Sequence, residues 1–248
     1  MKQNIYDNKN FSAEYDKMRK EKVGYNANDL IEIPNFRSLV PSVKNKRVLD
    51  LGCGYGENCK YYKDLGANYV LGTDISQHMI NMANIENKEE NIDYKVLPME
   101  ELNTLNQKFD IVLSSLAFHY IKDFKKLISD IYAILNEEGA LVFSQEHPMN
   151  TCIINNGEIE KSHIDINNKW FGLVADYNRC GLRKNLWNDE YVEKYHRNFS
   201  EIINTLVECG FKIEKVLEPL PSKLAISRVP KYEHQFDKPY FIFIKAIK

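Results

Sequence analysis

Residues 47–57 read RVLDLGCGYGE, a short apolar run that ends in three closely spaced glycines. A run of this length bounded by glycines predicts a strand buried on both faces, as in a parallel sheet. The segment 58–65 then predicts a helix that ends at Gly66. Such a strand-to-helix turn lies at the carboxyl edge of the sheet, where ligands bind. Glycines let a ligand approach the backbone, and the helix start offers free amide donors.

The alternation of strands and helices continues toward the C-terminus. Apolar runs predict further strands at 68–74, 92–97, 109–114, 140–144, 211–216 and 240–247. Apolar residues spaced by three and four predict helices at 79–85, 121–135 and 202–207, with Ser76 and Asn198 as N-caps. This alternation predicts an α/β fold whose mostly parallel sheet has helices on both faces.

Two segments interrupt this pattern. Residues 1–45 are polar with helical spacing in places, and residues 148–197 are rich in Asn and aromatic residues without clear alternation. We therefore expect a single domain over residues 1–248. Its parts are an N-terminal helical cap (1–45), a ligand-binding core (46–147), an insertion or lid (148–197) and the C-terminal part of the sheet (198–248).

Composition excludes several classes of protein. The chain has 33 Lys plus Arg and 35 Asp plus Glu, a net charge of −2, so it lacks the broad basic field of a nucleic-acid binder. No apolar run approaches the roughly 18 residues that span a bilayer, and the first residues lack a signal-peptide core. The five cysteines form no Cys-x-x-Cys pair, which predicts reduced thiols and no zinc site. We expect a cytoplasmic protein without a metal, nucleic-acid or membrane partner.

The glycine spacing departs from that of dinucleotide-binding proteins. A Gly-x-Gly-x-x-Gly loop would need glycine three residues after Gly54, where this chain has Glu57. No Gly-Lys-Ser/Thr follows, which excludes a P-loop. Asp74, at the end of the second predicted strand, can accept hydrogen bonds from both hydroxyls of a ribose. Met99 and Glu100, after the third strand, offer an apolar side chain and an acceptor for an adenine ring.

Four sequence elements together resemble class I S-adenosylmethionine-dependent methyltransferases, above all the small-molecule enzymes similar to quinone-biosynthesis methyltransferases. They are DLGCGYGE (50–57), Asp74, PMEEL (98–102) and FDIVLSSLAFHYI (109–121). The resemblance implies a Rossmann-like seven-stranded sheet with an antiparallel last strand. It also implies S-adenosylmethionine (SAM) as cofactor, S-adenosylhomocysteine (SAH) as product, and in-line methyl transfer to O, N or C of a small organic acceptor.

By the same resemblance, most of the cofactor-binding residues follow strand ends. Asp50, Gly52, Gly54 and Gly56 would contact the methionine and ribose part, and Asp74 would hold the ribose hydroxyls. Ile75, Met79, Met99 and Glu100 would surround the adenine, and Ser115 and Leu116 would lie under the sulfonium. Tyr15 and Arg19, in the N-terminal segment, could close over the cofactor.

Candidates for a base or an acceptor anchor follow the fourth and fifth strands: His119, Tyr120, Glu146 and His147. A base is needed only if the acceptor keeps its proton at neutral pH. We interpret His196 as a partly exposed histidine without a catalytic role. Trp187, Tyr191 and Tyr195 recur every four residues, which predicts a helix packing an apolar stripe against the domain.

Other functions stay open at this point. The chain could be a nicotinamide-dependent oxidoreductase, although Glu57 and the early Gly56 argue against it. It could also be a non-catalytic module that binds the cofactor or a partner protein. A nucleic-acid methyltransferase is disfavoured, because a near-neutral chain lacks the expected basic field. The sequence names no acceptor, and a monomer or a homodimer is compatible with it.

Overall fold

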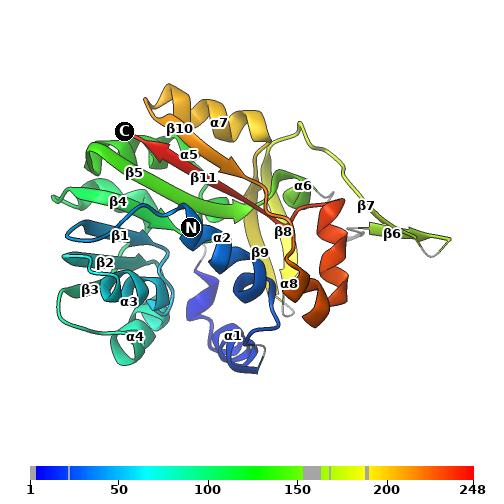
Figure 1. The fold of residues 1–248 in the computed structure, drawn as a ribbon, viewed down its shortest axis with the longest axis horizontal. Coiled ribbons are helices and arrows are strands. Elements are labelled where there is room, and N and C mark those ends of the chain that lie inside the picture. The colour runs from blue at the N-terminus through cyan, green and yellow to red at the C-terminus, as the bar shows by residue number, and fades with distance from the viewer. Residues whose placement is uncertain (1–3, 22, 153–162, 168, 188–189) are drawn as a thin grey trace.

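The computed structural model describes residues 4–21, 23–152, 163–167, 169–187 and 190–248. Its centre is a seven-stranded sheet in the order β10-β11-β5-β4-β1-β2-β3 (Figure 1). The strands are β1 (Arg47–Leu51), β2 (Tyr69–Asp74), β3 (Ile92–Val96), β4 (Phe109–Ser114), β5 (Leu135–Glu146), β10 (Lys212–Leu217) and β11 (Phe241–Ile247). Strand β11 runs antiparallel to both of its neighbours, β5 and β10, and all other pairs in this sheet are parallel. The predicted fold class is therefore confirmed.

The register of the parallel strands brings the predicted ligand-binding turns together. Leu51 pairs with Thr73, and Asp74 pairs with Val96, so the chain leaves three neighbouring strands at one edge. Strand β5 begins at Leu135, five residues before its predicted start at Ala140, because Leu135 pairs with Phe109 ahead of a shift in register.

Helices cover both faces of the sheet. On one face, α5 (Phe124–Ile134), α7 (Phe199–Glu208) and the 3-10 helix η3 (Met99–Thr104) bury apolar residues. On the other face lie α2 (Ile33–Leu39), α3 (Glu57–Asp64), α8 (Lys223–Arg228) and η5 (Pro230–Phe236). Helix α4 (Gln77–Glu86) contacts β2 and β3. The Ser76 and Asn198 side chains cap α4 and α7 as predicted, accepting from backbone amides at 3.1 and 2.8 Å.

The N-terminal segment lies at the edge where the parallel strands end (Figure 1). It contains η1 (Ile5–Asp7), α1 (Lys9–Glu21) and a π-helical turn, η2 (Asn28–Glu32), which continues into α2. Asp7 fastens it to α4, because its carboxylate accepts from the Ser76 hydroxyl at 2.6 Å and from the His78 amide at 3.0 Å. This contact satisfies amides at the start of α4 that no residue of that helix can reach.

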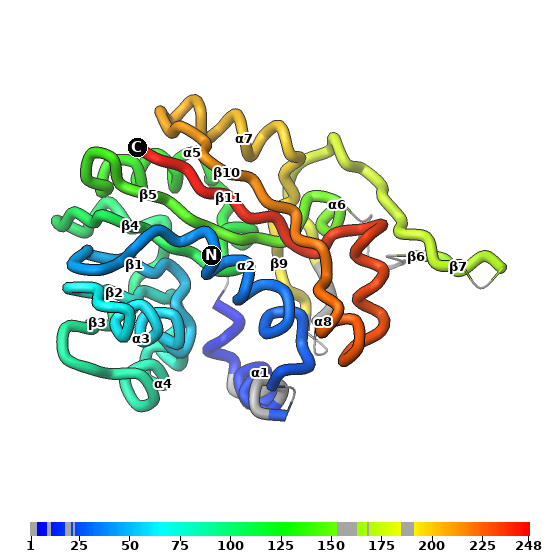
Figure 2. The backbone as a smooth tube through the Cα atoms, in the orientation of Figure 1, coloured from blue at the N-terminus to red at the C-terminus, as the bar shows by residue number. Residues whose placement is uncertain are grey.

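Short helix α6 (Pro148–Thr151) and two hairpins form the described part of the insertion. Strands β6 (His163–Ile166) and β7 (Lys169–Gly172) form a hairpin that projects from the body (Figure 2), and β8 (Gly181–Trp187) pairs with β9 (Glu190–His196). The predicted helix through Trp187, Tyr191 and Tyr195 is therefore wrong. A four-residue spacing also places side chains on one face of a strand, so the spacing alone cannot distinguish the two structures.

Candidate active site

A cavity of about 680 Å³ opens at the carboxyl ends of β1, β2, β4 and β5. Most of the residues predicted to bind the cofactor or the acceptor line it. They are Tyr15, Asp50, Gly52, Gly54, Asp74, Ile75, Met79, Met99, Glu100, Ser115, Leu116, His119, Tyr120 and Glu146. Gly56 and His147 do not line it, and the Arg19 side chain lies outside the described residues.

The glycine loop and the tip of β2 are joined directly. The Gly54 amide donates to Asp74 Oδ2 at 3.1 Å, and the Ser76 amide donates to Asp74 Oδ1 at 2.9 Å. Burial raises the pKa of the Asp74 carboxyl, an effect that these two amides oppose. Each carboxylate oxygen keeps a further lone pair, so Asp74 can still accept hydrogen bonds from a ligand.

The three glycines of the loop after β1 differ in their surroundings. Gly54 has φ 53° and no heavy atom within 4 Å of the position of a Cβ, so its backbone faces open cavity. Gly52 has φ 72°, and a Cβ there would lie 2.7 Å from the Ala117 side chain. A Cβ at Gly56 would overlap the Tyr94 hydroxyl, so this glycine allows packing beneath the loop and does not contact the cavity.

A second turn at the sheet edge carries backbone strain. Leu116, directly after β4, has φ 52°, a left-handed conformation that leucine rarely adopts. Two hydrogen bonds hold it there, because its amide donates to the Ser144 backbone oxygen and to the Ser144 hydroxyl, both at 3.1 Å. Strain of this kind tends to occur at functional sites, and Leu116 lines the cavity.

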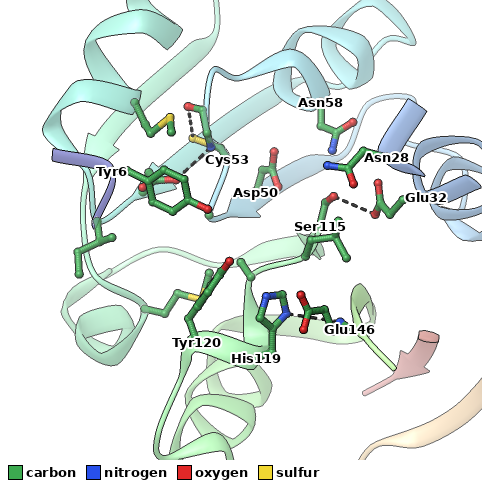
Figure 3. Close-up of a pocket in the computed structure, with 18 of the residues that line it drawn as sticks. Tyr6, Asn28, Glu32, Asp50, Cys53, Asn58, Ser115, His119, Tyr120 and Glu146 are labelled. Atoms are coloured by element: carbon green, nitrogen blue, oxygen red, sulfur yellow. Dashed lines mark hydrogen bonds between the residues drawn. The ribbon is translucent and has the colours of Figure 1, made fainter. Parts of the chain in front are cut away.

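Several polar cavity residues were not found from the sequence. Asn28 and Glu32 come from η2, Asn58 from α3, and all three lie near Asp50 at one end of the cavity (Figure 3). Glu32 is 1% exposed, and Ser115 Oγ and Ser144 Oγ donate to its Oε1 at 2.9 and 2.5 Å. The one sequence feature that links Asn28 and Glu32 is their spacing of four residues, which places two side chains on the same face of a helix.

His119, Tyr120 and Glu146 group at another end of the cavity (Figure 3). Lys194, supplied by β9 and also missed from the sequence, donates to Glu146 Oε1 at 2.5 Å. Burial would raise the pKa of Glu146, but Lys194 and His119 hold it below its usual value. Burial lowers the pKa of His119 to about 4, so this histidine is neutral at pH 7. Its ring contacts that of Tyr120 at a tilt of 50°, with centroids 4.2 Å apart.

His147 and His196 lie outside the cavity, and both make hydrogen bonds within the fold. His147 Nε2 lies 2.8 Å from Glu218 Oε1, and its Nδ1 accepts from the Met149 amide, so the ring caps α6 away from the cavity. His196 is fully buried, which corrects the expected partial exposure. Its Nδ1 lies 2.7 Å from Thr151 Oγ1, a contact that joins β9 to α6. Its Nε2 lies 2.9 Å from the Tyr177 backbone oxygen.

The N-terminal segment closes one side of the cavity with aromatic residues. Tyr6 and Tyr15 both line it, with their rings in edge contact at 5.4 Å. Tyr15 also contacts Tyr55 of the glycine loop, and the Tyr55 hydroxyl donates to Asp16 of α1. Tyr6 was not found from the sequence, because no motif surrounds it.

Comparisons with known proteins identify the family. A methyltransferase domain model matches residues 49–143. The crystal structure of an S-adenosylmethionine-dependent methyltransferase from Mesorhizobium loti superposes with a TM-score of 0.80 and 31% identity, covering 88% of this chain and 97% of that one. The chain belongs to the S-adenosylmethionine-dependent methyltransferases. Membership of this class argues against the nicotinamide-dependent oxidoreductase considered above.

Two further relatives of this methyltransferase differ in how much they share. An uncharacterised protein of Haemophilus influenzae is 35% identical over 98% of this chain and 96% of its own length. A ubiquinone biosynthesis O-methyltransferase of Bartonella tribocorum is 34% identical over 106 residues, 42% of each chain. Similarity to that O-methyltransferase therefore spans less than half of either protein.

The cavity residues of the methyltransferase fit SAM. The open backbone at Gly54 leaves room for the cofactor, Asp74 suits its ribose, and the carboxylates of Asp50 and Glu32 suit a positively charged group. Within the described residues, no helix is long and apolar enough to cross a membrane. The same residues contain no cluster of three or more His, Cys, Asp or Glu that could hold a metal ion.

Proposed function

We propose that this methyltransferase transfers the methyl group of SAM to O, N or C of a small organic acceptor by in-line displacement, as a monomer or a homodimer. The observation that supports this is a single cavity lined both by Asp74 and by the group of His119, Glu146 and Lys194. Its volume of about 680 Å³ lies within the roughly 300–1,000 Å³ typical of small-molecule sites. The cavity thus suits a cofactor and a small acceptor side by side.

The residues of the chain act by binding and orientation. Bound SAM supplies an activated methyl group on a sulfonium, so the chemistry of the leaving group belongs to the cofactor. Asp74 and the Gly54 backbone orient the adenosyl end, while His119 and Glu146 position the acceptor. Holding two reactants in line contributes up to about 7–11 kcal/mol to catalysis. Tyr6 and Tyr15 help to exclude water from the cavity.

Proton removal depends on the acceptor. A phenol or an ammonium group must lose its proton, whereas a carboxylate acceptor needs no base. His119 is neutral and Glu146 is ionised at pH 7, so each has a lone pair for a hydrogen bond from the acceptor, and the lowered pKa of each makes it a weak base. Burial raises the pKa of Tyr120, which therefore keeps its hydroxyl proton and can donate a hydrogen bond to the acceptor.

The test is an acceptor screen with methyl-labelled SAM and panels of phenols, carboxylic acids and amines. We expect acceptor-dependent SAH formation with the label on a small molecule, reduced in Glu146→Gln, which removes the carboxylate charge. A matched control is Glu218→Gln, because Glu218 lies outside the cavity. Transfer of the label only to RNA or protein, with no small molecule labelled, would overturn the proposal.

A further inference from the structure

A single 3-10 turn carries two of the residues at one end of the cavity. The turn is η4 (Phe118–Tyr120), and its His119 and Tyr120 side chains lie with Glu146 at that end (Figure 3). Two backbone hydrogen bonds close the turn, from the Tyr120 amide to the Ala117 oxygen at 3.1 Å and from the Ile121 amide to the Phe118 oxygen at 3.2 Å. Hydrogen bonds in a 3-10 turn have poor geometry, so its position depends on what packs against it.

Arg197, the residue that follows β9, binds the backbone of this turn. Its Nη1 donates to the Phe118 oxygen at 3.5 Å, and its Nη2 donates to the Ile121 oxygen and, at 3.2 Å, to the Lys122 oxygen. The guanidinium carbon lies 4.8 Å from the centroid of the Phe124 ring. Arg197 is 5% exposed and does not line the cavity. One side chain therefore holds three carbonyl groups of the turn and of the residues after it.

The charge of Arg197 is costly at this place. Burial lowers the pKa of Arg197 to about 10, so the guanidinium is still charged at pH 7. Its Nε lies 3.9 Å from the Glu201 carboxylate, whose side chain is 42% exposed, and a pair of this kind contributes little. An apolar side chain would fill the same space without the desolvation of a charge. What the guanidinium adds is a rigid fork of donors that fixes several carbonyls at once.

The same strand also supports the other side of this end of the cavity. Lys194 of β9 donates to Glu146, and His196 joins β9 to α6. The His119 Nδ1 atom lies 3.5 Å from the Glu146 backbone nitrogen, so the turn and the end of β5 are in contact. The placement of His119 relative to Glu146 therefore depends on β9 from two directions, through Lys194 and through Arg197.

We propose that Arg197 is a positioning residue for the methyl acceptor, which holds η4 so that His119 and Tyr120 face the cavity beside Glu146. This rests on the proposed function, in which His119 and Glu146 position the acceptor. Arg197 acts through the backbone of the turn and touches neither substrate. The β8–β9 hairpin of the insertion thereby influences which acceptor the enzyme binds.

The experiment titrates the histidine rings of the whole chain by NMR, with the His119 signal assigned from His119→Gln. Arg197→Met removes the charge and all donors, whereas Arg197→Lys keeps the charge and replaces the fork by one ammonium group. Burial lowers the pKa of His119 to about 4, so the native signal should not titrate between pH 5 and pH 8. We expect both variants to raise this pKa toward the ordinary 6.5, because a loosened turn admits water to the ring.

A second measurement separates the two ends of the cavity. SAH affinity, measured by calorimetry, should change by less than about twofold in Arg197→Lys, because Gly54 and Asp74 lie away from the turn. With a small acceptor found in the screen with methyl-labelled SAM, the same variant should raise the KM for the acceptor about tenfold. The KM for SAM should stay within about twofold of the native value.

Arg47→Met is the matched control. Arg47 also donates to a backbone carbonyl, that of Lys108 at 3.1 Å, and lies over an aromatic ring, that of Tyr69, at 4.6 Å. It is the first residue of β1 and does not line the cavity. We expect this variant to melt at a lower temperature while His119 still does not titrate between pH 5 and pH 8. The signal of His147, which lies outside the cavity, should be unchanged in every variant.

The outcomes have distinct meanings. A rise in the pKa of His119 in Arg197→Met but not in Arg197→Lys would show an effect of charge alone and overturn the proposal. An equal rise in Arg47→Met would show general loosening and also overturn it. If Arg197→Met does not fold, Arg197→Lys decides the question, because it retains the charge. An acceptor screen without any labelled small molecule would remove the proposed function, and the His119 titration would still decide whether Arg197 positions the turn.

Discussion

The Gly54 amide donates a 3.1 Å hydrogen bond to Asp74 Oδ2, which ties the glycine loop after β1 to the tip of β2. The two residues are 20 positions apart in the chain, and the parallel register of β1 with β2 brings them together. One carboxylate therefore fixes the loop and also faces the cavity. We therefore expect loop geometry and cofactor affinity to be coupled through this side chain.

Replacing Asp74 should weaken cofactor binding strongly. Asp74→Ala removes the proposed acceptor for the ribose hydroxyls and the anchor of the Gly54 amide, so we expect SAM affinity to fall by about tenfold or more. Calorimetry measures this directly. Asp93→Ala is the matched control, since this β3 carboxylate is largely exposed and pairs with Lys88. Unchanged affinity in Asp74→Ala would contradict the ribose assignment.

Adding a methyl group at Gly54 should block the ligand more than it disturbs the fold. Gly54→Ala places a Cβ into open cavity at positive φ, at a backbone cost of about 1–2 kcal/mol. Gly181→Ala is a matched control, with φ 131° and equally open surroundings but a position outside the cavity. We expect both variants to lose stability in thermal melts and only Gly54→Ala to lose SAM binding. A similar loss of SAM binding in both would refute this.

Cofactor binding should be linked to proton release from Asp50. Burial raises the pKa of the Asp50 carboxyl to about 7, so the group is largely protonated at pH 6 and largely ionised at pH 8. An ammonium group favours the ionised form, so SAH affinity should rise roughly tenfold from pH 6 to pH 8. Titration calorimetry at both pH values measures this.

The stability of the ligand-free protein should change with pH in the opposite direction to the SAH affinity. A pKa raised above the unfolded value contributes stability that is lost as pH rises through the folded pKa. The ligand-free chain should therefore melt at a lower temperature at pH 8 than at pH 6. Asp50→Asn should remove both this trend and the pH dependence of SAH affinity, and persistence of both trends in that variant would exclude Asp50 as their source.

Breaking the Lys194–Glu146 pair should destabilise the chain. Lys194→Met leaves a mostly buried carboxylate without its cation, at a cost of about 3 kcal/mol. The loss should be smaller at pH 5 than at pH 8, because an unpaired buried Glu146 is more readily protonated. Chemical denaturation of this variant, of Glu146→Gln and of the double variant measures the coupling. Additive losses in the double variant would mean that the pair contributes nothing.

The sequence predicted several of the residues that line the cavity. Asp50 and Asp74 lie in the last residues of β1 and β2, and Gly54 follows β1. The strands themselves are short apolar runs with clear boundaries. Once the sheet is parallel, those ends share one edge, so spacing along the chain is enough to place the residues together. The seven-stranded topology itself is implied by the family resemblance in the same stretch.

Only the tertiary structure decided which residues complete the cavity. Glu32, Lys194 and Tyr6 lie outside the motif-bearing stretch, on segments whose path over the sheet no local pattern specifies. The four-residue spacing of Trp187, Tyr191 and Tyr195 fits a helix and a strand equally. It therefore could not reveal the β8–β9 hairpin, in which β9 places Lys194 at the cavity. Contacts between chain segments far apart in sequence depend on packing, and packing is a property of the folded molecule.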